Sequence, residues 1–492
     1  MSQHEISLDR LQDAFSETYP RYTENEAVVE ANRCLYCFDA PCIAACPTGI
    51  DVPTFIRKIA TGNVLGAATT ILESNLMGHS CGRVCPVDEL CVGACVLGAE
   101  YRPIAIGRLQ RYATDHLFER GAMPFTPAPA TGKKVAVVGG GPAGLSCAGE
   151  LAKRGIAATV FEKQELPGGL STYGIVVLRE PVKVSLEEVA FVERLGVEVR
   201  AGVEVGANVG ADVGADVSPQ RLLDEYDAVV IAVGTGPVPK LGIPGEDAEG
   251  VIDALPFIAA TKLADKDGLE RLRDIPVGNE VVVVGAGNTA IDAATVAKRL
   301  GAERVTMVYR RGREQMTAYD FEVAFVQNEG VDIRLLTQPV EVLTEAGRAT
   351  GLRSVRMALG EPGPDGRRRP EPVPGSEFVL PCDQVIKAIG QEKLVPLFEA
   401  FGVETLHGYV RTDAALRTSN PNVFAAGDCI RLTGHALTVT AAQDGKIAAA
   451  AIAAQLGVPA PAPERVTGRA IHGTRHAGSG PAGATPGSVA HG

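Results

Sequence analysis

The chain has 492 residues, of which 46% are hydrophobic and 22% are charged, a composition that is ordinary for a soluble globular protein of about three domains. Its formal net charge of −12 argues against a nucleic-acid-binding protein, which would present a basic face. No stretch of roughly 18 consecutive apolar residues occurs, so no transmembrane helix is expected. The first residues lack the basic and apolar regions of a signal peptide, and we therefore expect a cytoplasmic protein.

The N-terminal segment, residues 1–120, is rich in cysteine. Eight of the 11 cysteines of the chain lie between Cys34 and Cys95, which in a large cytosolic protein indicates metal or redox chemistry rather than disulfides. Residues 52–77 lie between two groups of cysteines and have the apolar spacing of helices, which Gly62 and Asn63 separate. The other three cysteines and His435 have no partner spacing, and we interpret them as packing residues.

The eight cysteines form two closely spaced groups. The first is Cys34-x2-Cys37-x4-Cys42-x3-Cys46-Pro47, and the second is Cys81-x3-Cys85-Pro86-x4-Cys91-x3-Cys95. Thiolates at this spacing can converge on one inorganic centre. Three close cysteines followed by a Cys-Pro pair resemble the ferredoxin pattern, in which the fourth cysteine ligates the second of two clusters.

Structural zinc is the alternative interpretation of these cysteines. Zinc sites favour Cys-x2-Cys pairs, and only Cys34 and Cys37 have that spacing. We therefore predict two [4Fe–4S] clusters. The ferredoxin rule puts Cys34, Cys37 and Cys42 on one cluster and Cys46 on the other, but spacing alone does not decide which cysteines of the second group complete each cluster.

Two copies of a strand–glycine turn–helix unit follow a Pro- and Ala-rich linker at residues 121–131. The first copy has a strand at 133–138, the turn GGGPAG at 139–144 and a helix to about Arg154. The second has a strand at 281–284, the turn GAGNTA at 285–290 and a helix to about Leu300. A further strand follows each helix. This repetition predicts two dinucleotide-binding domains of the α/β class.

The first turn is predicted to bind FAD. Gly139 allows the tight turn, Gly141 lets the backbone approach a pyrophosphate, and Gly144 permits close helix packing. Pro142 and Ala143 belong to the same turn and are expected cofactor contacts.

Two acidic residues are predicted to contact the rest of the flavin cofactor. Glu162 ends the second strand of the first copy, where a carboxylate can accept hydrogen bonds from ribose hydroxyls. Gly427 and Asp428 follow a strand at 423–426, and an acidic residue there can hold a ribityl chain. The alternative for Asp428 is an ordinary helix cap.

The second turn is predicted to bind NADPH, through Ala286, Gly287, Asn288 and Thr289. Its second strand ends in Tyr309-Arg310-Arg311, without an acidic residue. Arginine pairs bind phosphate through two hydrogen bonds, so Arg310 and Arg311 favour NADPH over NADH. The alternative is a solvated basic strand end, and NADH then remains possible.

Three segments have the composition of loops or tails. The near-repeat at residues 205–217 and the Pro- and Arg-rich run at 361–374 are predicted to be surface loops. Residues 464–492 carry almost no bulky apolar side chains and are predicted to be disordered.

In combination, these motifs resemble a known family, the electron-input module that dihydropyrimidine dehydrogenase shares with the glutamate synthase small subunit. The resemblance covers about residues 25–460. The matching motifs are ANRCLYC (31–37), DAPC (39–42), CGRVCP (81–86), IGRLQ (106–110), GGLS (168–171) and GD (427–428).

The resemblance implies an α-helical N-terminal iron–sulfur domain followed by two Rossmann-like domains, for FAD and NADPH, of the two-domain flavoprotein type. It implies that one cluster is held by Cys34, Cys37, Cys42 and Cys95, and the other by Cys46, Cys85, Cys91 and Gln110, so Cys81 is not a ligand. The dehydrogenases look similar at Gln110, whereas the glutamate synthase small subunit typically has Glu there. The pyrimidine branch is therefore favoured.

Further cofactor contacts are expected at Gly169, Leu170, Arg179, Gly390 and Thr438. The run that contains Arg179 departs from the family pattern. The expected segments are the iron–sulfur domain (1–120), the first part of the FAD domain (133–247), the NADPH domain (248–384), the second part of the FAD domain (385–462) and the tail (463–492).

The resemblance implies that NADPH reduces FAD and that single electrons then pass through the two clusters to a partner. The cofactors supply the chemistry, so no side-chain general base is expected. The 492 residues contain no FMN barrel, and we expect the electron-transfer subunit of a hetero-oligomer, whose FMN-containing partner reduces uracil or thymine in pyrimidine catabolism. The alternatives are a glutamate synthase small subunit, a stand-alone NADPH:ferredoxin-type reductase, or a non-catalytic scaffold.

Overall fold

The computed structural model describes residues 7–206, 214–362 and 368–459. The predicted tail at 463–492 lies outside these residues, as do parts of the two predicted loops. None of the helices among the described residues is both long and apolar enough to cross a bilayer.

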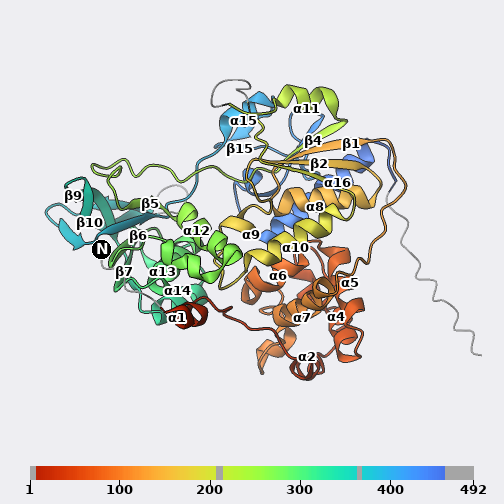
Figure 1. Cartoon of the computed structure of the whole chain (residues 1–492), viewed down its shortest axis with the longest axis horizontal. Helices are drawn as coiled ribbons and strands as arrows, with labels where there is room; N and C mark the ends of the chain where they lie inside the picture. The colour runs from red at the N-terminus through yellow and green to blue at the C-terminus, as the bar shows by residue number, and fades with distance from the viewer. Residues whose placement is uncertain (1–6, 207–213, 363–367, 460–492) are drawn as a thin grey trace, which may run out of the picture. The chain divides into compact units, whose positions relative to one another are not determined.

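The cysteine-rich segment is a set of short helices around an apolar core (Figure 1). These helices are α2 (Glu24–Ala31), α3 (Pro41–Ala44), α4 (Val52–Ala60), α5 (Val64–Ser74), α6 (Gly78–Val84) and α7 (Ile106–Glu119), with 3-10 turns η1 (Val87–Glu89) and η2 (Val96–Ala99). The first helix, α1 (Leu8–Ala14), instead packs through Leu11 into the core of the second dinucleotide unit. Helices α4 and α5 separate at Gly62 and Asn63 as predicted, because the Asn63 side chain accepts a hydrogen bond from Gly66 N and caps α5. The apolar face of α4 is buried, with Phe55, Ile56 and Ile59 fully covered.

The first dinucleotide unit forms a parallel five-stranded sheet in the order β16-β4-β1-β2-β3. Its strands are β1 (Lys134–Val138), β2 (Ala157–Glu162), β3 (Glu198–Ala201), β4 (Ala228–Ile231) and β16 (Val423–Ala425). In β1, Val135 and Val137 pack into the core that contains the cysteine-rich helices, whereas Ala136 and Val138 pack on the opposite face. The sheet and the cysteine-rich helices therefore share one core.

Helices α8 (Pro142–Lys153), α10 (Val182–Glu193) and α16 (Thr438–Gln455) lie between this sheet and the cysteine-rich helices (Figure 1). The short helix α9 (Leu170–Tyr173) precedes α10. On the other face of the sheet, α15 (Val395–Ala400) contributes Phe398 to the core, and α11 (Pro219–Glu225) contributes Leu222.

The second dinucleotide unit forms another parallel sheet, in the order β5-β13-β6-β7-β8. Its strands are β5 (Val251–Asp253), β6 (Glu280–Val284), β7 (Arg304–Val308), β8 (Asp332–Arg334) and β13 (Gln384–Lys387). Its helices are α12 (Ala254–Asp267), η3 (Leu269–Asp274), α13 (Asn288–Arg299), η4 (Arg313–Gln315) and α14 (Asp320–Asn328). Strand β13 pairs with β5 and β6, so this sheet extends past the boundary expected after residue 384.

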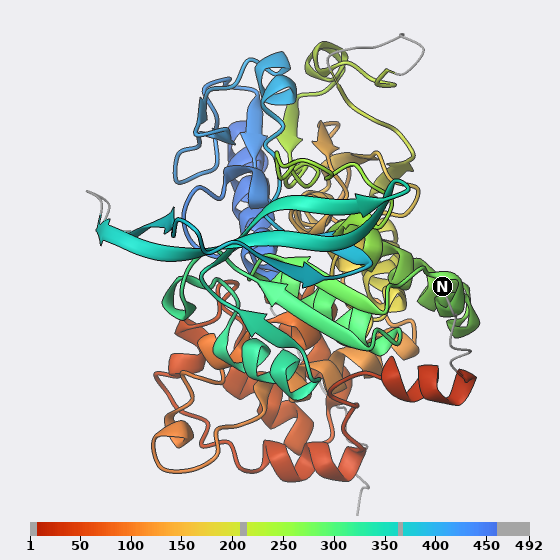
Figure 2. The same cartoon turned by 90° about the vertical axis from the view of Figure 1, so that its left-hand side faces the viewer.

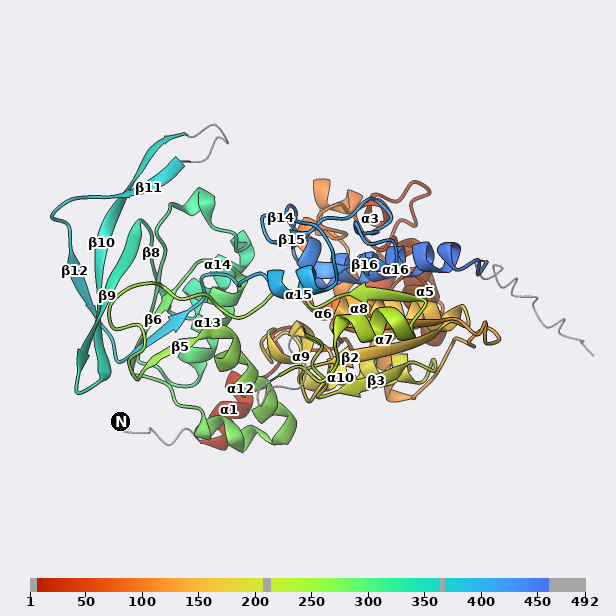
Figure 3. The same cartoon turned by 90° about the horizontal axis from the view of Figure 1, so that it is seen from above.

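An antiparallel sheet covers the other face of the second sheet (Figures 2 and 3). It contains β9 (Thr337–Glu345), β10 (Arg348–Pro362), β11 (Arg368–Pro372) and β12 (Phe378–Pro381). The prediction of a loop over the whole of 361–374 is wrong, because β11 pairs with β10 there. Its prolines are tolerated because β11 is an edge strand.

Buried charged residues connect these units. The Lys262 ammonium in α12 donates to the Glu180 carbonyl oxygen, and Arg179 pairs with Asp292 in α13, at 3.3 Å, and with Glu322 in α14. Burial lowers the pKa of Lys262 to about 8 and raises that of Asp292 to about 6. These groups link the segment before α10 to the second sheet's helices.

Glu188 in α10 links the first sheet's domain to the cysteine-rich helices. Its Oε1 accepts hydrogen bonds from His79 N and Ser80 N, each at 2.9 Å, and its Oε2 accepts one from the Ser80 hydroxyl at 2.6 Å. The carboxyl group therefore caps the first turn of α6 from another element. Burial raises the pKa of Glu188 to about 8.

The raised pKa of Glu188 predicts that the difference in melting temperature between Glu188→Gln and the wild type depends on pH. The folded-state pKa of about 8 lies above the ordinary 4.5, so between these values the folded protein holds a proton that the unfolded chain has released, and the stabilisation is lost progressively as the pH rises from about 4.5 to 8. Glu188→Gln should melt close to the wild type at pH 5 and gain relative to it at pH 9.

Glu188→Ala is the matched disruptive variant. It leaves two N–H groups and one hydroxyl without an acceptor, each at a cost of about 1–3 kcal/mol, and should lower the melting temperature by at least about 5 °C at pH 5. Thermal unfolding followed by circular dichroism at both pH values measures these differences. A Gln variant whose offset from the wild type is constant with pH would contradict the raised pKa.

Candidate cofactor sites

Four cysteines from the two groups line one small cavity: Cys34, Cys37, Cys42 and Cys95. Cys34 follows the end of α2, Cys42 lies in α3, and Cys95 immediately precedes η2. Apolar side chains such as Ile56 and Ile104 complete the wall. Four thiols around a cavity with an apolar wall have the donor chemistry of an iron–sulfur site.

The charge balance of this cavity also fits a cationic centre. Burial, together with the charge of the neighbouring Cys34, raises the pKa of Cys42 to about 11. Several thiolates are therefore unfavourable here unless a metal balances them. No group of three or more His, Cys, Asp or Glu side chains in the described part of the chain could hold a single metal ion. The support for the first predicted ligand set is the cavity that its four cysteines line, and the set stays a prediction.

The second predicted ligand set is Cys46, Cys85, Cys91 and Gln110. Burial raises the pKa of Cys91 to about 12, and the charge of Cys46 contributes to this shift, so these thiols lie within electrostatic reach of each other. Gln110 is buried in α7, and its Nε2 donates to Gly78 O at 2.8 Å. Its oxygen is then the end available as a ligand. This set also stays a prediction.

Cys81 lies close to the second set. It is buried in α6, and its pKa is raised well above the ordinary value, first by a hydrogen bond with Cys85 and then by burial. Its side chain packs in the apolar core. Cys81 is therefore a direct neighbour of Cys85, a predicted ligand. The exclusion of Cys81 from the ligand set stays a prediction.

The first glycine turn has the geometry of a dinucleotide site. Gly139 has φ +106°, and a Cβ on Gly144 would collide with the Gly139 carbonyl oxygen, so both positions require glycine. Gly141 stands at the N-cap of α8 without a side-chain cap, and Pro142 occupies the first turn. Backbone N–H groups at a helix N-terminus with no side-chain cap favour a phosphate.

Glu162 lies at this turn. Its Oε2 accepts a hydrogen bond from Gly140 N and its Oε1 accepts one from Gln164 N, both at 2.8 Å. The carboxylate is therefore fixed in place, and each oxygen retains a lone pair for a ribose hydroxyl. That contact with FAD stays a prediction.

Two distant segments approach the same turn. A Cβ on Gly169, the N-cap of α9, would come within 2.8 Å of Gly141 Cα, and one on Gly427 would come within 3.0 Å of Ala143 Cβ. Gly169 and Gly427 therefore both lie beside the first glycine turn, and the contacts of Gly169, Leu170, Gly427 and Asp428 with FAD stay a prediction.

Asp428 and Thr438 lie in the C-terminal segment of this site. Asp428 is the second residue of η5 (Gly427–Ile430), whose N-cap is Ala426, so Asp428 is not an ordinary helix cap. Burial raises the pKa of Asp428, and Arg431 opposes that rise. Thr438 is the first residue of α16.

Arg179 has carboxylate partners, Asp292 and Glu322. Both lie in helices of the second sheet's domain. The guanidinium thus joins the two dinucleotide domains, and a flavin contact stays a prediction.

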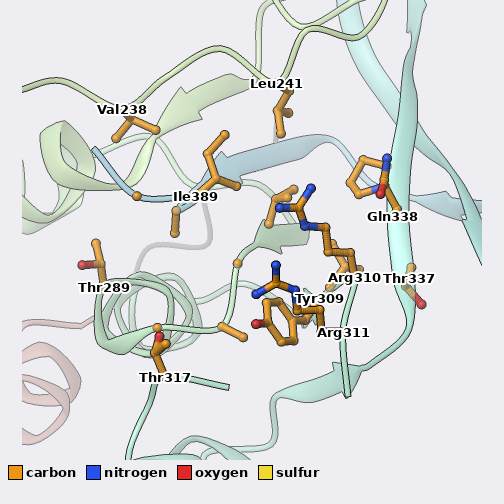
Figure 4. Close-up of a pocket in the computed structure, with 18 of the residues that line it drawn as sticks. Val238, Leu241, Thr289, Tyr309, Arg310, Arg311, Thr317, Thr337, Gln338 and Ile389 are labelled. Atoms are coloured by element: carbon orange, nitrogen blue, oxygen red, sulfur yellow. The ribbon is translucent and has the colours of Figure 1, made fainter. Parts of the chain in front are cut away.

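The second glycine turn opens into a cavity of about 560 Å³ (Figure 4), a size typical of ligand sites. Six predicted residues line it: Ala286, Gly287, Thr289, Arg310, Arg311 and Gly390. Asn288 does not line it, although its buried Oδ1 has no hydrogen-bond partner among the described residues. Gly287 is the N-cap of α13 without a side-chain cap, which again suits a phosphate.

Arg310 and Arg311 extend from the end of β7 into this cavity (Figure 4). Neither has an ion-pair partner among the described residues, and no acidic side chain lines the cavity. Arg311 Nε is buried without a hydrogen-bond partner. Two guanidinium groups without an acidic partner can form charge-assisted hydrogen bonds to a phosphate monoester, which would supply the missing negative charge.

Sequence reasoning missed several lining residues of this cavity, including Tyr309, Thr317, Gln338 and Gln391. Tyr309 was the nearest signal, because it precedes the two arginines, and its hydroxyl donates to Gln315 O at 2.6 Å. Gln338 lies in β9, and no local motif marks a residue that the antiparallel sheet brings to the cavity.

Two family models match successive parts of the chain. Residues 10–122 match the family model for dihydropyrimidine dehydrogenase domain II, 4Fe-4S cluster, and residues 133–454 match that for pyridine nucleotide-disulphide oxidoreductase. The chain is 39% identical over 460 residues to the glutamate synthase [NADPH] small chain of Halomonas elongata, covering 90% of this chain and 94% of that protein.

Two further similarities are more distant. The NADP(+)-dependent formate dehydrogenase subunit beta of Moorella thermoacetica is 36% identical over 442 residues, covering 84% of this chain and 59% of that protein. The structure of Mycobacterium tuberculosis FprA in complex with NADPH superposes with a TM-score of 0.53 at 21% identity, over 67% of this chain and 85% of that one, which shows the fold alone. The chain belongs to the pyridine nucleotide-disulphide oxidoreductase family, in the group that carries an N-terminal 4Fe-4S domain and includes glutamate synthase small chains.

Proposed function

We propose that the protein is the electron-input subunit of an NADPH-dependent enzyme. The observation that carries this proposal is the cavity lined by four cysteines in a helical domain that shares its core with the first dinucleotide sheet. A redox centre bound there would be joined to the first glycine turn through this shared core, against which Cys34, Cys42 and Cys95 pack and which contains Ala143.

The chain's own residues bind and orient in this proposal. The N-termini of α8 and α13 would hold the phosphates of FAD and NADPH, Glu162 and Asp428 the sugar hydroxyls of FAD, and the two cysteine sets the clusters. When bound, FAD accepts the hydride of NADPH as two electrons and the [4Fe–4S] clusters carry single electrons onward. No side-chain base is required.

For the final acceptor we favour the catalytic chain of a glutamate synthase. The chain is 39% identical to a glutamate synthase small chain over nearly the full length of that protein. This similarity is stronger support than the single side chain of Gln110, which favours a dihydropyrimidine dehydrogenase. Gln110 favours the FMN-containing chain of a dihydropyrimidine dehydrogenase, which remains the second candidate.

Reconstitution with each catalytic chain tests the proposal. The purified holoprotein should reduce ferricyanide with NADPH without any partner. Adding a glutamate synthase catalytic chain from the same organism, with glutamine and 2-oxoglutarate, should yield glutamate at the expense of NADPH. Dihydrouracil formed from uracil with a dehydrogenase chain would instead support the second candidate. Dye reduction with neither product would indicate a stand-alone reductase, and no dye reduction would refute the electron-input role.

The cavity arginines predict the nicotinamide preference. Each charge-assisted contact to the 2′-phosphate contributes about 1.5–3 kcal/mol. Replacing both Arg310 and Arg311 with Ala should therefore raise KM for NADPH at least about tenfold and change activity with NADH little. Steady-state ferricyanide reduction measures both.

Arg313→Ala is the matched control, because Arg313 is close in sequence but pairs with Asp320 and does not line the cavity. It should leave both KM values unchanged. A wild-type enzyme that prefers NADH would refute phosphate recognition by the two arginines.

The ligand sets predict the iron content of two variants. Cys37→Ala should lose about half the cluster iron, because Cys37 belongs to one of two four-ligand sets, whereas Cys81→Ala should retain all of it. Iron and sulfide analysis after anaerobic purification measures this. Iron loss from the Cys81 variant would show that Cys81 is a ligand, and bound zinc in the wild type would refute the clusters.

A further inference from the structure

Lys446 joins the flavin domain to the cysteine-rich domain. It lies in α16, eight residues after Thr438, which is about 12 Å along the helix axis. Its Nζ donates to Thr48 O at 3.0 Å and to Ser74 O at 2.9 Å. Ser74 is the last residue of α5, so the ammonium caps the negative end of that helix.

Thr48 continues this contact to a predicted cluster ligand. It is buried, and its Oγ1 lies 3.3 Å from the Sγ of Cys46. The hydroxyl can donate to the sulfur when Cys46 is a thiolate. Thr48 therefore accepts a hydrogen bond from Lys446 at its carbonyl oxygen, and its hydroxyl can donate one to the sulfur of Cys46.

Lys446 forms no salt bridge with a carboxylate among the described residues. Glu150 in α8 acts on it electrostatically, but that carboxylate pairs with Lys153 at 2.7 Å and with Arg154 at 2.8 Å. The hydrogen-bond acceptors of Lys446 Nζ in the described part of the chain are the two carbonyl oxygens. Burial lowers the pKa of Lys446 and the charges of Glu150 and Cys46 oppose that shift, so the ammonium and the Cys46 sulfur lie within electrostatic reach of each other.

We propose that Lys446 is a positioning residue that raises the reduction potential of the centre held by Cys46, through its charge and through its hold on Thr48. A nearby cation stabilises the more negative reduced state, and hydrogen bonds to ligand sulfurs act in the same direction. The proposal rests on the proposed function, in which Cys46 ligates a cluster.

The test compares variants in a reductive titration of the holoprotein monitored by electron paramagnetic resonance. Lys446→Met keeps the length of the side chain and removes its charge. It should lower the midpoint potential of one of the two cluster signals by about 59 mV. For a one-electron step this shift corresponds to about a tenfold change in the redox equilibrium constant. Lys446→Arg should restore most of the wild-type potential, with iron content unchanged.

Two more variants separate tuning from folding. Thr48→Val removes only the hydroxyl and should shift the same signal in the same direction by a smaller amount, even if Lys446→Met fails to load its clusters. Lys153→Met removes a neighbouring positive charge that is paired with Glu150, and should leave both potentials unchanged.

An unchanged potential in both Lys446→Met and Thr48→Val would overturn the proposal. An equal shift in Lys153→Met would also overturn it, because the effect would then be a general field and not a specific contact. Failure of the proposed function is a different result: the wild-type protein would show no iron–sulfur signal at all.

Discussion

The structure depends on the close contact between α8 and α16. A Cβ on Gly445 would collide with the Ala143 carbonyl oxygen and come within 2.8 Å of Cys147 N, so only glycine allows the two helices to approach this closely. α8 begins directly after the first glycine turn, and Gly445 of α16 lies against Ala143 in that turn. The same approach brings Lys446 to the cysteine-rich helices. A larger residue at 445 would separate the flavin turn, the Gly427–Asp428 segment and the Lys446 contact at once.

Buried charges fix how the remaining units meet this pair of helices. Placing the charges of Arg179 and Lys262 and the polar carboxyl group of Glu188 between domains has a large desolvation cost, which hydrogen bonds and opposite charges offset only in one geometry. Apolar contacts alone would tolerate sliding, whereas a misplaced partner here leaves a charge uncompensated. The ionic contacts therefore specify the orientation of the two sheets more than they stabilise it.

The sequence predicted the parts of the molecule that local chemistry determines. The turns at 139–144 and 285–290 were recognisable because a positive φ and close packing exclude other residues, and Arg310 and Arg311 because a strand end places them. Lys446 and Gln338 could not be predicted, since their positions depend on contacts with elements far away in the chain. The loop prediction at 361–374 failed because edge strands accept prolines, so composition does not separate the two states there.

The burial of Gln110 limits what this residue can say about the identity of the electron acceptor. The side chain is buried in α7 and bound to Gly78 O, so it cannot touch another protein. Its identity can act on the centre that it would ligate, but recognition of a partner chain requires exposed groups. If Gln110 ligates a cluster as predicted, a glutamine at this position would bear on the tuning of that cluster and only indirectly on the acceptor. For this reason similarity over the whole chain, which includes its surface, carries more weight for the choice of partner than the single residue that favours the pyrimidine branch.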